Sequence, residues 1–332
     1  LKQGPPAALL RLARQLARSV HLRPLAASKV DRGDGLARGK RAKPVKADAI
    51  ELALHTHPVA AFRSVALACL AQLLANEGGV LHSEDIEYLH QARVALRRLR
   101  AALRVFAPAL PTGFVARWGP AWRELAQSLG AARDHDVFRT GLLPDLVPLL
   151  GPRDAARLQA WARVQGQAAT AAARRSLASR DTSDHLLAFT RDLLRLKAGQ
   201  PGAPTESLLP WALKRLRQRH RRLLNGIRAA DLFDAVERHQ VRIEAKKLRY
   251  ALDFLGSLWP PEALADLTEA LVQAQELLGQ MNDRVSAQHL LATGPQGGAE
   301  RLEMVLGAQL VQSAAHLPLV LKGVVQSPTP WK

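Results

Sequence analysis

Cysteine is almost absent from this sequence of 332 residues. Cys69 is the only one, which excludes an intrachain disulfide and a cysteine-based metal cluster. It lies in the apolar run SVALACLAQLL, where a small buried core residue is expected. We expect no stretch of the sequence to span a bilayer. We also expect no signal peptide at the start, because Pro5, Pro6 and Arg11 interrupt the apolar run that a signal peptide needs. These absences favour a reducing, cytoplasmic location.

Segments of alternating polar and apolar residues, typical of half-buried strands, are lacking as well. Alanine, leucine and arginine dominate, and apolar residues recur at helical spacing almost throughout. The sequence therefore predicts an all-α fold. Glycine and proline predict breaks between helices at Gly78–Gly79, Pro108–Gly113, Gly151–Pro152, Gln200–Pro204, Pro260–Pro261 and Gly294–Gly298.

Acidic residues are scarce, with 29 Asp and Glu against 47 Lys and Arg, a net charge of +18. Such an excess favours polyanionic partners, and nucleic acid, an anionic membrane and polyphosphate all fit at this level. No acid occurs from Tyr88 to Leu110 or from Leu208 to Ala230, although both segments are rich in arginine. Like charges at i,i+4 on a helix cost about 0.2–0.5 kcal/mol each. Helices of this kind are not typical of a solvated surface and favour a bound anion.

The cation-rich pattern occurs twice, with 149 positions between equivalent residues. Each copy is followed, 40 residues after its histidine, by Leu-Gly and then an acid, which predicts two similar units in one fold. The first copy contains His90, Arg93, Arg97, Arg98, Arg100 and Arg104, and the second contains His239, Arg242, Lys246, Lys247 and Arg249. The counterpart of Arg104 is Asp253, so the second copy is one cation shorter.

The loop around Pro201, Gly202 and Pro204 separates the two repeats, at about 52–198 and about 205–325. Each repeat has room for about four helices, which predicts two up-and-down four-helix bundles. Residues 1–50 are strongly basic and are interpreted as a linker with a short helix from Pro6 to Val20. Residues 326–332 are expected to form a frayed C-terminus.

Helical spacing places the first row of cations, from His90 to Arg104, on one face over about 21 Å. Arginine grips phosphate through two parallel hydrogen bonds, so the rows predict a phosphate-rich ligand. The histidines could contact this ligand or only support the helices. The Leu-Gly elements, with the acids of Arg133–Asp136 and Asn282–Arg284, are interpreted as helix caps or partners of an arginine. A metal or catalytic role for them is less favoured, because only Asp134, His135 and Asp136 cluster locally.

The signature His-x-x-Arg-x-x-x-(Arg/Lys)-(Arg/Lys)-x-Arg, present twice and followed each time by Leu-Gly and Asp, resembles that of CHAD domains. These are histidine-containing α-helical domains that bind inorganic polyphosphate. The resemblance covers roughly residues 52–325 and implies two pseudo-symmetric four-helix bundles with a basic groove or pore between them. The two rows would line opposite sides of it. Lys214, Arg217 and Arg221, on the preceding helix of the second repeat, would extend the surface, while the equivalent segment FRSVALACLAQLL is apolar.

The first 50 residues resemble the end of a CYTH (triphosphate tunnel) domain, through Pro24, the segment Ser28–Gly33 and Leu36-Ala37. CYTH hydrolases hold their metal with a Glu-x-Glu-x-Lys element, which this sequence lacks. We therefore expect no enzymatic activity, cofactor or metal in this chain.

The predicted function is non-catalytic binding of inorganic polyphosphate, which would target the protein to polyphosphate granules in the cytoplasm. We expect no membrane partner and no specific DNA sequence. One alternative is a helical nucleic-acid-binding protein, although aromatic residues for base stacking are few. Another is one part of a CYTH-CHAD phosphoanhydride hydrolase whose catalytic domain is missing here. A third is a scaffold whose basic faces meet an acidic protein.

Overall fold

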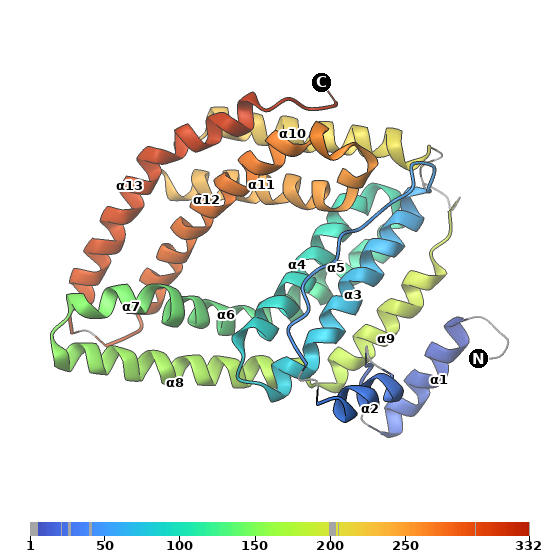
Figure 1. Ribbon diagram of the computed structural model, residues 1–332, viewed down its shortest axis with the longest axis horizontal. Helices are drawn as coiled ribbons and strands as arrows, with labels where there is room; N and C mark the ends of the chain where they lie inside the picture. The colour runs from blue at the N-terminus through green and yellow to red at the C-terminus, as the bar shows by residue number, and fades with distance from the viewer. Residues whose placement is uncertain are drawn as a thin grey trace. The chain divides into compact units, whose positions relative to one another are not determined.

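The computed structural model describes residues 6–20, 22–25, 28–39, 42–198, 204, 206–295 and 297–331 (Figure 1). These residues form helices and no strand, so the all-α prediction is confirmed. The α-helices are α1 (Pro6–Ser19), α2 (Lys29–Ala37), α3 (Pro58–His82), α4 (Ile86–Phe106), α5 (Thr112–Ser128), α6 (Gly130–Val137), α7 (Leu143–Leu146), α8 (Pro152–Leu177), α9 (Arg180–Arg195), α10 (Leu208–Ala229), α11 (Ala235–Leu255), α12 (Ala265–Leu291) and α13 (Ala299–Gln326). Short 3-10 segments are η1 (Ala107–Ala109), η3 (Val147–Leu149), η4 (Gly256–Leu258) and η5 (Pro261–Ala263), and a π-helical turn, η2 (Phe138–Leu142), follows α6.

The chain divides into two compact units. Unit one contains Leu1–Ala131 and Thr170–Trp211, and unit two contains Ala132–Ala169 and Ala212–Lys332. This division differs from the boundaries predicted for the two repeats, because α8 begins in unit two and ends in unit one. The pairing of the helices into two pseudo-symmetric bundles stays a prediction.

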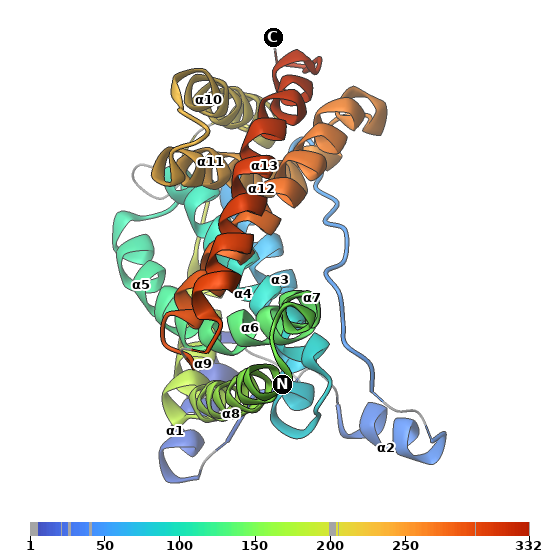
Figure 2. The same ribbon diagram turned by 90° about the vertical axis from the view of Figure 1, so that its left-hand side faces the viewer.

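Unit one is built around α3 and α4, which run side by side in both views (Figures 1 and 2). Aromatic rings from α3, α4, α5, α9 and the first turn of α10 fill its centre. Phe62 contacts Phe106 and Phe114, and Phe106 stacks on Trp211 with ring centroids 5.1 Å apart. Cys69 is 1% exposed, as predicted for a core residue, and burial raises the pKa of its thiol to about 12.

The predicted break at Gly78–Gly79 is wrong, because α3 continues through both glycines to His82. A Cβ atom on Gly79 would clash with the ring of Tyr88 on α4. The glycine therefore serves the close approach of two helices and not a turn. The breaks predicted at Pro108–Gly113, Gly151–Pro152 and Pro260–Pro261 do coincide with helix ends. Part of the predicted break at Gln200–Pro204 lies outside the described residues.

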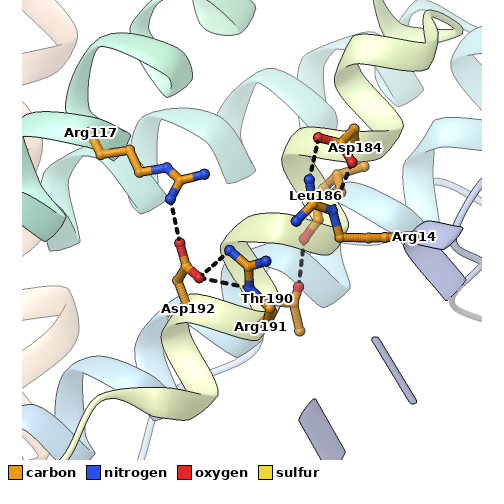
Figure 3. A network of polar contacts seen from close by, with 7 residues as sticks. All are labelled: Arg14, Arg117, Asp184, Leu186, Thr190, Arg191 and Asp192. Atoms are coloured by element: carbon orange, nitrogen blue, oxygen red, sulfur yellow. Dashed lines mark hydrogen bonds and ion pairs between the residues drawn. The ribbon is translucent and has the colours of Figure 1, made fainter. Parts of the chain in front are cut away.

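The N-terminal region packs against the long helices of unit one, to which it belongs. α1 agrees with the helix predicted from Pro6 to Val20, and it lies against α9. Arg14 donates from Nε and Nη2 to the two carboxylate oxygens of Asp184, at 2.8 and 3.0 Å (Figure 3). Val45 and Asn76 exchange two hydrogen bonds between backbone and side-chain amide. Much of the segment interpreted as a linker is thus fastened to the helices.

One hydrophobic core cluster of unit two lies where α12 and α13 meet the segment from η2 to α8. Phe138, Leu146, Leu158, Leu291 and Leu306 are among its buried residues. At the other end of α13, the tail predicted to be frayed is instead packed as far as residue 331.

The packing of this tail centres on Trp331, which is 2% exposed. Arg217 Nε on α10 donates to its carbonyl oxygen at 2.7 Å, and the indole N–H lies 3.3 Å from Nδ1 of His220. A large aromatic ring near the end of the chain therefore holds the tail against α10.

Among the described residues, two helices are long and apolar enough to cross a membrane by length and composition alone, which corrects the expectation that no stretch is. They are α3, with 56% of its apolar window buried inside the protein, and α13, with 22% buried. A core helix passes the same test, so two such helices are weak evidence for a membrane-spanning chain.

Candidate functional site

α4 presents the first row of cations. The helix begins after Asp85, whose carboxylate accepts the backbone N–H of Glu87 at 2.9 Å and caps the N-terminus. Its apolar side, which includes Leu96, Leu99 and Leu103, is buried in unit one. The opposite side carries the row, whose members His90, Arg93, Arg97 and Arg100 are half-buried and whose last member, Arg104, is exposed. The structure therefore places these five residues on one accessible face.

The cations of this face repel one another. Partial burial lowers the pKa of Arg100, and the nearby positive charges of Arg104, Arg123 and Arg93 lower it further. Arg123 is exposed on α5, and reasoning from the sequence missed it. Only the packing of α5 against α4 adds Arg123 to the row, and no spacing in the sequence signals that contact.

The first Leu-Gly element serves this row. A Cβ atom on Gly130 would lie 3.0 Å from Nη1 of Arg93, so the missing side chain leaves space for the guanidinium group. The equivalent Gly279 in the second copy has open space around its Cβ position. The two glycines are equivalent in sequence and differ in role.

Arg98 does not lie with the other arginines of α4. Its side chain is 6% exposed, and its positive charge acts on the thiol of Cys69 in α3. The helical position explains this, because residue 98 lies one step around the helix from Arg97 and faces α3. The prediction that Arg98 lies in the ligand site is therefore not supported by its position.

α11 presents the second row. Asp234 caps the helix by accepting the backbone N–H groups of Val236 and Glu237. Arg242 and Lys246 are half-buried, while His239 and Arg249 are exposed. These four side chains make up the row that helical spacing predicts for this helix.

Acids and amides share the surface of α11 with these cations. Lys247 donates to Glu244 at 2.6 Å on the same helix, and Arg249 donates to the side-chain amide of Gln275 at 3.0 Å. The second row is thus less densely cationic than the first.

A cavity of about 420 Å³ opens where the first turns of α11 meet α12. His239 and Arg242 line it from α11, together with Arg238. Arg238 donates from Nη1 to the carbonyl oxygens of Leu232 and Phe233, which fixes the turn before α11. The guanidinium of Arg238 thus has a structural role, and Arg242 and His239 supply the polar groups of α11 to the cavity.

The charge state of His239 depends on this setting. Partial burial lowers the pKa of its imidazole, and the positive charges of Arg242 and Lys246 lower it further. The unligated imidazole is therefore mainly neutral at neutral pH. An anion bound beside it would reverse this effect and favour protonation.

Comparison with known families assigns this helical chain to one of them. The model of the CHAD domain family matches residues 64–292. The chain belongs to the CHAD family. The resemblance found from the repeated signature is thus confirmed, while the resemblance of residues 1–50 to a CYTH tail stays a prediction. No curated protein matches the chain.

Two solved structures support the assignment of the CHAD fold. A crystal structure of the CHAD domain from the plant Ricinus communis is 30% identical, with a TM-score of 0.74, over 87% of this chain and 99% of that one. PptA from Streptomyces chartreusis is 19% identical, with a TM-score of 0.59, over 82% of this chain and 99% of that one. The second likeness shows the fold alone.

The remaining predicted residues of the CHAD domain have other settings. Lys214, Arg217 and Arg221 are exposed on α10, and Arg217 also holds the C-terminal tail through Trp331. Asp136 is buried, which raises the pKa of its carboxyl group, and Arg139 lies 3.7 Å away. Among the described residues, no three His, Cys, Asp or Glu side chains are grouped to hold a metal ion.

Proposed function

We propose that this protein binds inorganic polyphosphate without catalysis, and that binding attaches it to polyphosphate granules. One observation carries the proposal: four arginines of α4 and Arg123 of α5 form a single cationic face, and every charged neighbour that shifts the pKa of Arg100 is itself a cation. Gathering these charges costs free energy in the unligated protein. A bound polyanion removes that cost.

The arginines favour phosphate over a general anion. A guanidinium group donates two parallel hydrogen bonds to a phosphate, and four arginines at helical spacing offer such forks along about 16 Å of helix. A thin, flexible chain of phosphates can follow a straight row on one helix. The row on α11 offers the same chemistry with fewer cations, and Lys214 and Arg221 are exposed on α10 of the same unit.

The test replaces charges on the row and compares them with equal charges elsewhere. We expect Arg97→Gln/Arg100→Gln/Arg104→Gln to weaken binding of long-chain polyphosphate strongly, in a fluorescence anisotropy titration at several salt concentrations. Because this variant lacks three phosphate-binding cations, the slope of log Kd against log salt concentration should fall by about 2, at about 0.7 per neutralised phosphate of a flexible polyanion.

The matched control is Arg153→Gln/Arg157→Gln/Arg163→Gln, which removes three exposed arginines of α8. It lowers the net charge equally and should change the affinity by less than about threefold, because screened long-range charge contributes little. Equal losses in both variants would show that only net charge matters and would overturn the proposal. Displacement of polyphosphate by equal charge concentrations of single-stranded DNA would favour a nucleic-acid binder instead.

A further inference from the structure

We propose that the cavity between α11 and α12 binds the nucleoside of a nucleoside oligophosphate, such as ATP, with its phosphates on the cationic row of α11. The inference rests on the proposed function, because it uses the same row for the phosphates. The nucleoside oligophosphate is a second class of ligand, because it joins an aromatic base to the phosphates that the cationic row binds.

The walls of the cavity are mainly apolar. Leu278, Met281 and Val285 line it from α12, and Ala235 and Val236 line it from α11. Met281 is 2% exposed, so this wall belongs to the buried side of α12. A bare phosphate chain gains nothing from such walls and would lose hydration against them. The cavity therefore fits a ligand that has an apolar part to bury.

Polar groups converge on the same cavity from one face of α12. Asn282, Ser286 and His289 follow at spacings of four and three, so their side chains share one side of the helix. An amide, a hydroxyl and an imidazole can bond the ring nitrogens and hydroxyls of a nucleoside. An acyl chain of similar size would form no hydrogen bonds with these three side chains, which favours the nucleoside.

The cationic row begins in the wall of the cavity. His239 and Arg242 line the cavity, and Lys246 lies one helical turn further along, about 6 Å away. A triphosphate that leaves the cavity at Arg242 thus reaches Lys246. The cavity volume of about 420 Å³ falls within the range of about 300–1,000 Å³ that is usual for small-molecule sites.

The test measures binding of ATP, tripolyphosphate and long-chain polyphosphate by isothermal titration calorimetry, without divalent metal. ATP and tripolyphosphate carry similar charge, so their ratio reports the contribution of the nucleoside. We expect ATP to bind at least tenfold more tightly than tripolyphosphate. Ser286→Trp, which fills the cavity, should remove this preference and change the affinity for long-chain polyphosphate by less than twofold.

The matched control is Gln280→Trp, which adds the same ring to an exposed position of α12 outside the cavity and should preserve the preference for ATP. Asn282→Leu is a smaller change and should lower the ATP preference severalfold, which keeps the test open if Ser286→Trp fails to fold. Equal affinities for ATP and tripolyphosphate, or an unchanged preference in Ser286→Trp, would overturn the inference. Weak binding of long-chain polyphosphate with a retained ATP preference would instead contradict the proposed function.

Discussion

α4 and α11 carry equivalent rows of cations, yet the two helices present them differently. α4 has no acid from Tyr88 to its end, and its arginines repel one another. α11 contains Glu244 and Asp253, and Glu244 binds Lys247. The repeat thus preserves the positions of the cations but not their charge density. We infer that the α4 row contributes more of the affinity, whereas α11, with its cavity, contributes more of the selectivity.

The largest expected effect is the loss of polyphosphate affinity when the cations of either row are replaced. Arg97→Gln/Arg100→Gln/Arg104→Gln should weaken polyphosphate binding about 100-fold, and Arg242→Gln/Lys246→Gln/Arg249→Gln about tenfold. The reason is that Glu244 and Asp253 lie on α11 near its row and lower the net positive charge there, whereas α4 has no acid from Tyr88 to its end. Titration of both variants at one salt concentration measures the difference. Equal losses would mean that the acids of α11 do not reduce its charge toward the ligand.

The second comparison concerns Arg98 and Lys247, which occupy equivalent positions in the repeat. Arg98 is buried, so Arg98→Ala should lower the free energy of unfolding by about 2–3 kcal/mol through the missing packing and the cavity it leaves. Lys247→Ala removes one partly exposed ion pair and should cost about 0.5 kcal/mol. Urea denaturation of both variants checks the order. A stable Arg98→Ala variant that no longer binds polyphosphate would show that Arg98 contacts the ligand.

Much of this architecture was predictable, because it depends on local pattern. The helical spacing of apolar residues predicts the all-α fold, and the repeated signature predicts the family. Arg98 shows what the sequence cannot predict. The signature specifies the residue types, but it does not say which side of the helix packs against α3. Arg123 shows it again, because its place beside Arg100 depends on packing between two helices.

Glycines are the other source of error. The sequence favours a break at Gly79, although the function of this glycine is to admit the ring of Tyr88. A glycine needed for close packing and a glycine needed for a turn look the same in a single sequence. Only the neighbouring helix distinguishes them.

Gly130 and Gly279 are equivalent glycines of the repeat, and only Gly130 has a neighbouring side chain close to its Cβ position. Gly279→Ala should raise the free energy of unfolding by about 0.5–1 kcal/mol, because alanine favours the helix and nothing lies within 4 Å. Gly130→Ala should raise the free energy of unfolding by less, because the new methyl group displaces the guanidinium of Arg93. Its polyphosphate affinity should fall about two- to threefold, equivalent to about 0.5 kcal/mol. Thermal melts and titrations of the two variants separate these effects, and equal gains in stability would contradict the contact between Gly130 and Arg93.

The smallest expected effect is the pH dependence that His239 gives to the α11 row. In the unligated protein its pKa lies below the usual 6.5, because of partial burial and the charges of Arg242 and Lys246. Bound phosphate brings negative charge and raises this pKa, so binding takes up a proton. The affinity should therefore rise as the pH falls through the pKa of the bound state and level off below the pKa of the free state.

This dependence can be assigned to His239 by comparing variants. The charged and titratable groups around it include Arg242 and Lys246, which lower its pKa, and Arg238 and His289, which line the same cavity. Affinity should rise a few-fold between pH 8 and pH 6, and His239→Gln should remove most of this rise. An NMR titration of the His239 ring with and without polyphosphate measures the shift itself. If the ligand leaves that pKa unchanged, the histidine supports the helix without contacting phosphate, and the α11 row begins at Arg242.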